Sequence, residues 1–173
     1  MIRSFRGIKP RIAASAYVDP GAHVIGDVEI GERSSIWPTV VLRGDIEPIR
    51  VGADTNIQDG TIVHTDKGFP AIIGDRVSVG HAAVLHGCIV EEDALIGMGA
   101  LVLTGAKIGR GAVVAAAALV PEGMEVPPDT LVMGAPAKPR RPVSAEEKLR
   151  FQKGVSGYME RGQQAREEAE ESA

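Results

Sequence analysis

Three of the four histidines of this 173-residue chain, His64, His81 and His86, lie within 23 residues of one another. Imidazole nitrogen is a common zinc ligand, and a zinc ion held by three neutral imidazoles keeps a fourth position open for water or substrate. Zinc with an open position supplies a nucleophile at neutral pH. The three histidines therefore suggest a catalytic metal site, provided that the fold brings them together.

A six-residue apolar repeat surrounds these histidines and runs through most of the chain. Its aliphatic positions are Val18, Val24, Ile30, Ile36, Leu42, Val51, Ile57, Val63, Ile73, Val79, Leu85, Val90, Ile96, Val102, Ile108, Val114 and Val120. Neither an amphipathic helix nor an antiparallel hairpin protein has this period. Hexapeptide periodicity is typical of a parallel β-helix, in which each hexad forms a short strand and a corner. We therefore expect an all-β parallel β-helix over residues 1–142, with small residues at corners where φ is positive.

The composition agrees with one narrow aliphatic core. Aromatic residues make up only 3% of the chain, and the 21 glycines and 11 prolines suit tight corners. A net charge of −4 argues against a nucleic-acid or anionic membrane partner. No apolar run is long enough for a membrane span, and the first residues lack the apolar region of a signal peptide. The single cysteine, Cys88, excludes an internal disulfide and favours the cytoplasm; we expect it to be a small buried residue.

The C-terminal part departs from the repeat. Several prolines end the hexads, and Ser144 and Glu147 have the spacing of a capping box. A helix is expected from about Ala145 to about Glu168, so that residues 143–173 form a C-terminal helix and tail of the same domain. We expect this helix to lie along the flank of the β-helix through a modest apolar stripe. The stripe consists of Leu149, Val155, Tyr158 and Met159.

Counting hexads places the histidines if three hexads make one coil. One face then carries the stacked aliphatic residues Leu42, Val63 and Leu85. Arg43, His64 and His86 each follow one of these by one residue, so they form a column with the spacing of neighbouring strands, about 4.8 Å. Asp59 and His81 form a second column on another part of the perimeter.

One chain can hardly offer all three imidazoles to one ion. His64 and His86 could share a metal, whereas His81 points away around the prism. A cyclic homotrimer solves this, because the second column of one chain can face the first column of the next. The neighbouring Arg43 and Asp45 are then expected to have an electrostatic role at the subunit interface.

The chain resembles the γ-class carbonic anhydrases over nearly its whole length. This resemblance implies a left-handed β-helix, whereas the general rule for parallel crossovers would favour the right hand. The matching stretches are 41–45 (VLRGD), 55–60 (TNIQDG), 63–64 (VH), 79–81 (VGH), 85–88 (LHGC), 96–100 (IGMGA) and 134–138 (GAPAK).

The resemblance also implies an activity, a cofactor and an assembly. The family's zinc ligands fall on His64, His81 and His86 and are divided between neighbouring subunits of a homotrimer. The implied reaction is the reversible hydration of carbon dioxide to bicarbonate, catalysed by zinc, and iron(II) or cobalt could occupy the same imidazoles.

The same resemblance assigns roles to five further residues. The family's interface ion pair falls on Arg43 and Asp45. Its glutamine beside the metal-bound water falls on Gln58, with Asn56 and Asp59 around it. Asp59 would fix the geometry as an outer carboxylate, and Gln58 would orient the nucleophile.

The sequence departs from the family's prototype at the step that exports the proton. The prototype has an acidic loop with a glutamate shuttle, and a second glutamate directly after the aspartate of its Arg-x-Asp motif. Here Ile46 follows Asp45, and the loop after His64 is short. The hydration rate is therefore expected to be low unless another group moves the proton. The candidates are Glu47, Asp66 and Tyr158.

Two other classes of function remain open from the sequence. Many hexapeptide-repeat trimers are acyl-CoA-dependent acyltransferases that share the segment 134–138 and use one histidine without a metal. A non-catalytic trimer that binds a metal or a metallophore is the other alternative. Bound zinc, close to one ion per chain, would separate the first alternative from a carbonic anhydrase.

Overall fold

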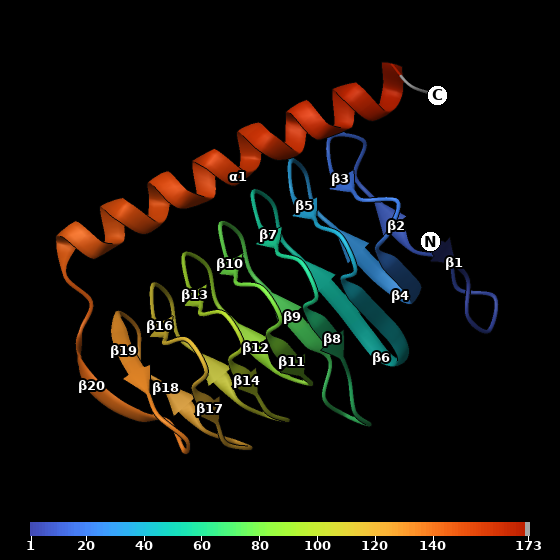
Figure 1. Cartoon of the computed structure of the whole chain (residues 1–173). Helices are drawn as coiled ribbons and strands as arrows, with labels where there is room; N and C mark the ends of the chain where they lie inside the picture. Colours follow the sequence, from blue (N-terminus) through green and yellow to red (C-terminus); the bar gives the residue numbers. More distant parts are fainter. Residues whose placement is uncertain (172–173) are drawn as a thin grey trace.

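The computed structural model describes residues 1–171 and shows stacked coils with one long helix beside them (Figure 1). Over this range the chain forms twenty strands and one helix. All strand pairs between coils are parallel, and only the last pair is antiparallel. The predicted fold class, a left-handed parallel β-helix with a C-terminal helix on its flank, is confirmed.

One sheet forms the face beneath the helix. Its strand order is β20-β19-β16-β13-β10-β7-β5-β3. The bounds are β3 (Tyr17–Val18), β5 (Ser35–Ile36), β7 (Asn56–Ile57), β10 (Ser78–Val79), β13 (Leu95–Ile96), β16 (Val113–Val114), β19 (Thr130–Met133) and β20 (Lys138–Pro142).

A second sheet wraps around the other two faces because β4 (His23–Ile30) and β6 (Val41–Val51) run through the corner. The first half of β6 pairs with β8 and the second half with β9. We call the first of these faces the histidine face. It continues from β6 through β8 (Ile62–His64), β11 (Val84–His86), β14 (Leu101–Val102) and β17 (Leu119–Val120). The other face continues through β9 (Ala71–Ile73), β12 (Ile89–Val90), β15 (Lys107–Ile108) and β18 (Glu125–Val126), and the short β1 (Ile2–Arg3) and β2 (Arg11–Ile12) pair with β4.

The hexad aliphatics form the core in the predicted register. Leu42 pairs with Val63, and Val63 pairs with Leu85 on the next coil. These three side chains are fully buried. Burial of each aliphatic side chain of this size contributes about 1.5–3 kcal/mol. The assumption of three hexads per coil is therefore correct, and the relative heights of the histidines follow from it.

Small residues do not fill every left-handed corner, contrary to our expectation. Arg33, Asp54, Arg76 and Asp93 occupy one corner column with φ between 56° and 60°. Their side chains point outward, where they have room, and pair between coils. The distance from Nε to the carboxylate is 2.7 Å in both the Arg33–Asp54 and the Arg76–Asp93 pair. Residues of this size are tolerated because the corner turns its side chains into solvent.

Helix α1 (Ala145–Glu171) begins at the predicted capping box. The backbone N–H of Ser144 donates to the Glu147 carboxylate at 2.9 Å, and the N–H of Glu147 donates to the Ser144 hydroxyl at 3.2 Å. The helix runs three residues beyond the predicted end at Glu168; residues 172–173 of the expected tail lie outside the described residues.

The helix packs along the flank, against β3, β5 and β7. Val155 is buried there, and the ring of Tyr158 lies 5.6 Å from that of Trp37. Leu149 was wrongly placed on the packed stripe, because it is 60% exposed. The α1 sequence is too polar to cross a membrane, and no other helix occurs in residues 1–171.

The close stacking of coils predicts a stability difference between two glycines. A Cβ on Gly109 would lie 2.6 Å from the Pro128 nitrogen, whereas a Cβ on Gly123 would meet no atom of residues 1–171 within 4 Å. Gly109→Ala should lower the free energy of unfolding by about 3 kcal/mol, because two backbones must separate. Gly123→Ala should cost only about 1 kcal/mol, from its left-handed φ of 65°.

Thermal unfolding followed by circular dichroism, at one protein concentration, measures both effects. About 1 kcal/mol corresponds to roughly 2–4 °C in Tm for a chain of this size. Equal Tm values for the two variants would contradict the inferred contact between coils.

Candidate metal centre

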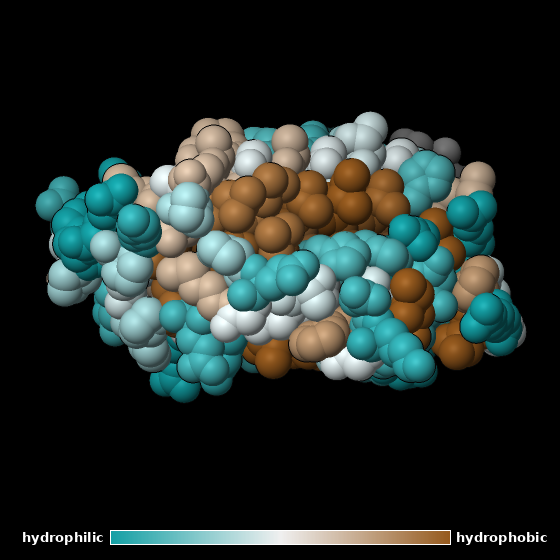
Figure 2. All heavy atoms as spheres, turned by 90° about the horizontal axis from the view of Figure 1, so that it is seen from below, coloured by the Kyte–Doolittle hydropathy of each residue, from teal (hydrophilic) through white to brown (hydrophobic). Residues whose placement is uncertain are grey.

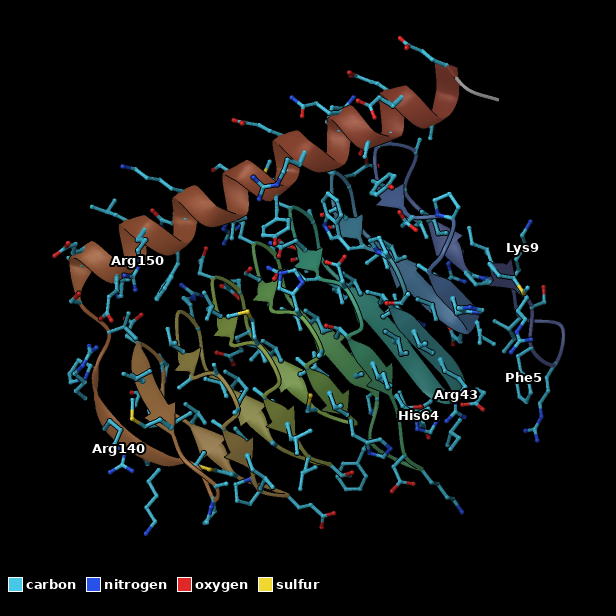
Figure 3. All side chains as sticks on the ribbon, viewed as in Figure 1. Phe5, Lys9, Arg43, His64, Arg140 and Arg150 are labelled. Carbon is cyan, nitrogen blue, oxygen red and sulfur yellow. The ribbon has the colours of Figure 1, made fainter. Side chains whose placement is uncertain are left out.

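His64 and His86 lie in one column at the ends of β8 and β11. The strand register pairs Arg43 with His64 and His64 with His86. The two imidazoles approach closely, with 3.1 Å between Nδ1 of His64 and Nε2 of His86. Figure 3 shows Arg43 and His64 together at this edge of the solenoid. The predicted column is therefore confirmed, and the fold brings two of the three candidate ligands together.

Asp45 holds the other nitrogen of His64. Its Oδ1 lies 3.0 Å from Nε2 of His64, and its Oδ2 accepts a hydrogen bond of 2.6 Å from Nη1 of Arg43. Partial burial raises the pKa of the Asp45 carboxyl, but the hydrogen bonds from Arg43 and His64 outweigh this and leave the pKa below its usual value. An ionised Asp45 accepts the Nε2–H of His64, so Nδ1 carries the lone pair.

His81 lies in the second column, as predicted. Ile57 pairs with Val79, so Asp59 and His81 follow at matching positions on adjacent coils. The Nδ1 of His81 is 2.9 Å from Oδ2 of Asp59, and both side chains are about half exposed. Asp59 therefore anchors one nitrogen of His81 and leaves Nε2 available.

Asn56 and Gln58 join a buried polar cluster with Ser78. The Gln58 amide donates from Nε2 to Asn56 Oδ1 at 2.9 Å and to Ser78 Oγ at 3.3 Å. The Ser78 hydroxyl donates to the same Asn56 oxygen at 2.9 Å. Asn56 is 2% exposed, and its Nδ2 has no hydrogen-bond partner among the described residues. These contacts fix the amide orientation of Gln58, whose Oε1 remains an acceptor.

The two groups of predicted residues occupy different corners of a single chain. Arg43 and Asp45 lie with His64 and His86 at the end of the histidine face, whereas Asn56, Gln58 and Asp59 lie with His81 before that face begins. Within residues 1–171, no three histidine, cysteine, aspartate or glutamate side chains are placed to hold one metal ion. Each chain therefore provides two parts of the predicted site, at opposite edges of one face.

Two contact residues escaped the sequence analysis. Ser78 belongs to the Gln58 cluster, and Thr104 places its Oγ1 2.9 Å from Nδ1 of His86. Ser78 follows from the register, because it pairs with Asn56. Thr104 lies two residues after Val102, the register partner of Leu85, and so one position beyond the one that matches His86. The count alone gave no reason to single out a serine and a threonine.

The donor atoms present fit a zinc ion. Two nitrogens on a tetrahedral zinc with Zn–N of about 2.0–2.1 Å are about 3.3 Å apart, close to the observed separation. In addition, each histidine has an oxygen within 3.0 Å of one nitrogen, from Asp45, Asp59 or Thr104. Metal-binding histidines are typically held in this way. Cys88 does not contribute, because it is buried and burial raises the pKa of its thiol to about 12.

The candidate proton acceptors differ in their surroundings. Glu47 accepts the N–H of Gly68 at 2.9 Å and so holds the loop after His64 in place. Asp66 is exposed at the start of this loop. Tyr158 lies on α1, against Trp37 and beneath the guanidinium of Arg161, on another face. Of the three, Asp66 combines an exposed carboxylate with a position two residues from His64.

An apolar stripe separates the two histidine columns. Outward-facing side chains on the histidine face pair from coil to coil; these are Val41, Ile62, Val84, Leu101 and Leu119. Ile62 is 44% exposed, and Met98, on the coil after His81, is 59% exposed. Figure 2 views this underside of the solenoid and shows apolar atoms gathered in a band. Bands of this kind are typical of protein interfaces.

Comparison with known proteins agrees with this architecture. A family model described as "Bacterial transferase hexapeptide (six repeats)" matches residues 9–44. A Methanocaldococcus jannaschii protein named "Probable carbonic anhydrase" is 51% identical and covers 86% of this chain and 93% of its own length. "Gamma carbonic anhydrase 2, mitochondrial" of Arabidopsis thaliana is 43% identical over 87% of this chain and 56% of its own length.

A solved structure from Bacillus cereus, which carries a provisional acetyltransferase name, superposes with a TM-score of 0.94. It is 42% identical, and the match covers 95% of each chain. The chain described here belongs to the γ-class carbonic anhydrase family of hexapeptide-repeat proteins.

The lowered pKa of Asp45 predicts a pH-dependent stability. A carboxyl with a lower pKa in the folded than in the unfolded chain stabilises the fold above its unfolded pKa of about 3.9, and this contribution disappears as the pH falls through the folded value. Arg43→Met should therefore lower Tm by about 2–4 °C at pH 7, since a partly exposed pair contributes up to about 1 kcal/mol. The difference should vanish near pH 2.

The control is Arg50→Met, which removes a 2.8 Å ion pair with Asp27 and a 3.3 Å ion pair with Glu29 and leaves Asp45 untouched. In metal-free protein, the NMR titration of the Asp45 carboxyl should move to higher pH in Arg43→Met only. An unchanged Asp45 titration in that variant would contradict the inferred pairing.

Proposed function

We propose that this protein is a zinc-dependent carbonic anhydrase that converts carbon dioxide and water reversibly to bicarbonate and a proton, at sites shared between subunits of a homotrimer. The observation that carries the proposal is the 3.1 Å approach of His64 Nδ1 and His86 Nε2, each ring being anchored through its other nitrogen. The carbonic anhydrase names of the relatives support the substrate.

The chain's residues would divide the binding of the metal between neighbours. His64 and His86 of one subunit supply two nitrogens, and the partner subunit's His81 supplies the third. Asp45 and Asp59 would orient their histidines and fix the ring nitrogen that presents its lone pair to the metal. Zinc held in this way lowers the pKa of a bound water to about 7 and supplies the nucleophile for carbon dioxide.

Gln58 would orient the reacting water. Its Nε2 is occupied by Asn56 and Ser78, so Oε1 is the atom free to accept a hydrogen bond from the water. This hydrogen bond would direct a lone pair of the water oxygen toward the carbon of carbon dioxide. The proton released with each bicarbonate must then reach solvent, and the exposed carboxylate of Asp66 is the acceptor that we favour.

The apolar stripe supports assembly into a trimer. It lies on the face between the His81 column and the His64–His86 column. Covering this stripe with a second copy removes apolar surface from water and brings the His81 edge of one chain toward the His64–His86 edge of another. The contact joins two different edges, so it is heterologous, and in the proposed homotrimer it closes after three subunits.

Acyl transfer is the second candidate, because the Bacillus cereus relative carries a provisional acetyltransferase name. Such an enzyme would bind acetyl coenzyme A and would need no metal. Isothermal titration with acetyl coenzyme A distinguishes the two, and the proposal expects no binding. A protein that binds zinc in trimers but hydrates no carbon dioxide would instead belong to the non-catalytic, metal-binding class.

Mixing of variant subunits tests the shared site directly. His64→Ala chains retain His81, and His81→Ala chains retain His64 and His86, so a mixed trimer contains intact sites. After unfolding and refolding together in equal amounts, about a quarter of the sites should be intact by random assortment, and zinc binding should return to that extent. Metal analysis and stopped-flow hydration of carbon dioxide measure the recovery.

The control mixture combines His64→Ala with His86→Ala, two changes in the same column. Every site then lacks one ligand, whichever chains are neighbours, so no zinc binding should return. Recovery of zinc binding in both mixtures would rule out the proposed division of ligands. So would recovery in neither mixture, provided that the wild type treated in the same way regains its full zinc content. Wild-type protein that takes up no zinc would rule out the metal site itself.

Gln58→Ala should separate orientation of the water from metal binding. The variant should retain close to one zinc per chain and lose about 100-fold in kcat, the size expected for a positioned polar partner of the reacting group. Ser156→Ala, an exposed change on α1, should leave kcat unaltered. Wild-type kcat in Gln58→Ala would remove Gln58 from the mechanism.

A further inference from the structure

The three histidines differ in what holds their second nitrogen. Asp45 and Asp59 provide carboxylates for His64 and His81, whereas a neutral hydroxyl, Thr104 Oγ1, lies 2.9 Å from Nδ1 of His86. We propose that Thr104 is a positioning residue that accepts the Nδ1–H of His86 when metal is bound and thereby sets the affinity of the site for its metal. This inference rests on the proposed zinc site.

The backbone keeps Thr104 in place beneath His86. Leu85 pairs with Val102, so Thr104 follows on the coil directly after the histidine. The carbonyl oxygen of Thr104 accepts the N–H of Gly123 at 2.9 Å, and the N–H of Gly105 donates to the carbonyl of Gly87 at 2.7 Å. Hydrogen bonds to coils on both sides thus fix this corner, and the hydroxyl is presented to the imidazole by a rigid element.

The loop after His64 covers the same corner through Phe69. A Cβ on Gly87 would lie 2.9 Å from Phe69 Cβ, and a Cβ on Gly105 would lie 3.2 Å from Phe69 Cε1. Phe69 therefore packs against Gly87, which follows His86, and its ring packs against Gly105, which follows Thr104. Both His86 and Thr104 are only partly exposed. Restricted access of water makes the protein hydroxyl the principal partner for Nδ1 of His86.

The tautomer of His86 decides whether the pair of imidazoles can accept a cation. With Asp45 on Nε2 of His64, the Nδ1 lone pair of His64 faces Nε2 of His86. If Nε2 of His86 carries the proton, the two rings hydrogen-bond and no lone pair is left for a metal. If Nδ1 carries it and donates to Thr104, both lone pairs converge on one point. A metal ion requires the second tautomer, in which the hydroxyl must accept.

A carboxylate would enforce that tautomer at all times, whereas a hydroxyl can also donate to Nδ1 when the metal is absent. The Thr104 hydroxyl can therefore form a hydrogen bond with His86 both with and without bound metal. Removal of the hydroxyl leaves the Nδ1–H of His86 without an acceptor when zinc is bound. The metal-bound state is then destabilised more than the metal-free state, because coordination makes the remaining N–H of His86 a stronger hydrogen-bond donor.

The test compares Thr104→Val, Thr104→Ser and the control Thr130→Val, which removes a hydroxyl bonded to a backbone carbonyl in the last coil. Zinc dissociation constants are measured by competition with a chelator on the assembled protein. Thr104→Val should bind zinc about 10-fold more weakly, at the lower end of the effect of outer partners of metal ligands. Thr104→Ser and Thr130→Val should remain within about twofold of wild type.

A second measurement reports the tautomer directly. In zinc-loaded wild type, the Nδ1–H of His86 should give a nitrogen–proton NMR signal that exchanges slowly with water. The signal should persist in Thr104→Ser and be lost to exchange in Thr104→Val. Circular dichroism establishes that each variant retains the β-helix.

The outcomes separate this inference from the proposed function. Wild-type zinc affinity in Thr104→Val, or equal losses in the valine and serine variants, would overturn the role of the hydroxyl while the zinc site stands. Absence of zinc binding in the wild type would overturn both. A loss in Thr104→Val that Thr104→Ser restores, together with the exchange of the His86 signal, is the result that the geometry predicts.

Discussion

The stacking of each coil on the next, by parallel backbone hydrogen bonds in a register of three hexads, is the constraint on which the rest of the structure depends. It places Leu42, Val63 and Leu85 over one another and, one residue later, Arg43, His64 and His86. Because the backbones are so close, glycine is required where coils touch, as at Gly109. Long side chains are tolerated at the corners where they point outward, as at Arg33 and Arg76. A site built on this scaffold inherits its precision from regular backbone hydrogen bonding and not from a mobile loop.

The solenoid also explains why the candidate ligands fall in two separate columns of a single chain. Residues that lie the same number of positions after stacked strands form a straight column. His81 therefore cannot reach the column of His64 and His86 within the same chain. Convergence of the three imidazoles requires two solenoids side by side. The apolar stripe between the columns provides a physical reason for such contact, since it leaves Ile62 and its neighbours partly exposed to water. Assembly and metal binding are therefore linked in the proposed function.

The hexad count predicted the fold class and the two columns, and the spacing of Ser144 and Glu147 predicted the capping box of α1. Each of these features depends on local periodicity or on a short motif. The predictions from the sequence were less successful where side-chain packing determines the structure. Leu149 had the right spacing for the helix stripe, but its side chain is 60% exposed. The charged corner residues Arg33 and Asp54 contradicted the expected preference for small side chains, because their pairing across coils is a contact between residues 21 positions apart.

The sequence by itself determined which residues share a column, since counting hexads, with three hexads per coil, gives their relative height even where residues are inserted between hexads. Only the tertiary structure decided which atoms meet: the 3.1 Å approach of the two imidazoles, the amide orientation of Gln58, and the contacts of Ser78 and Thr104. The physical reason is that side-chain direction and hydrogen bonding depend on neighbours a full coil away. Those neighbours are ordinary serines and threonines in the sequence, and only their position beside a histidine or a glutamine gives them a role.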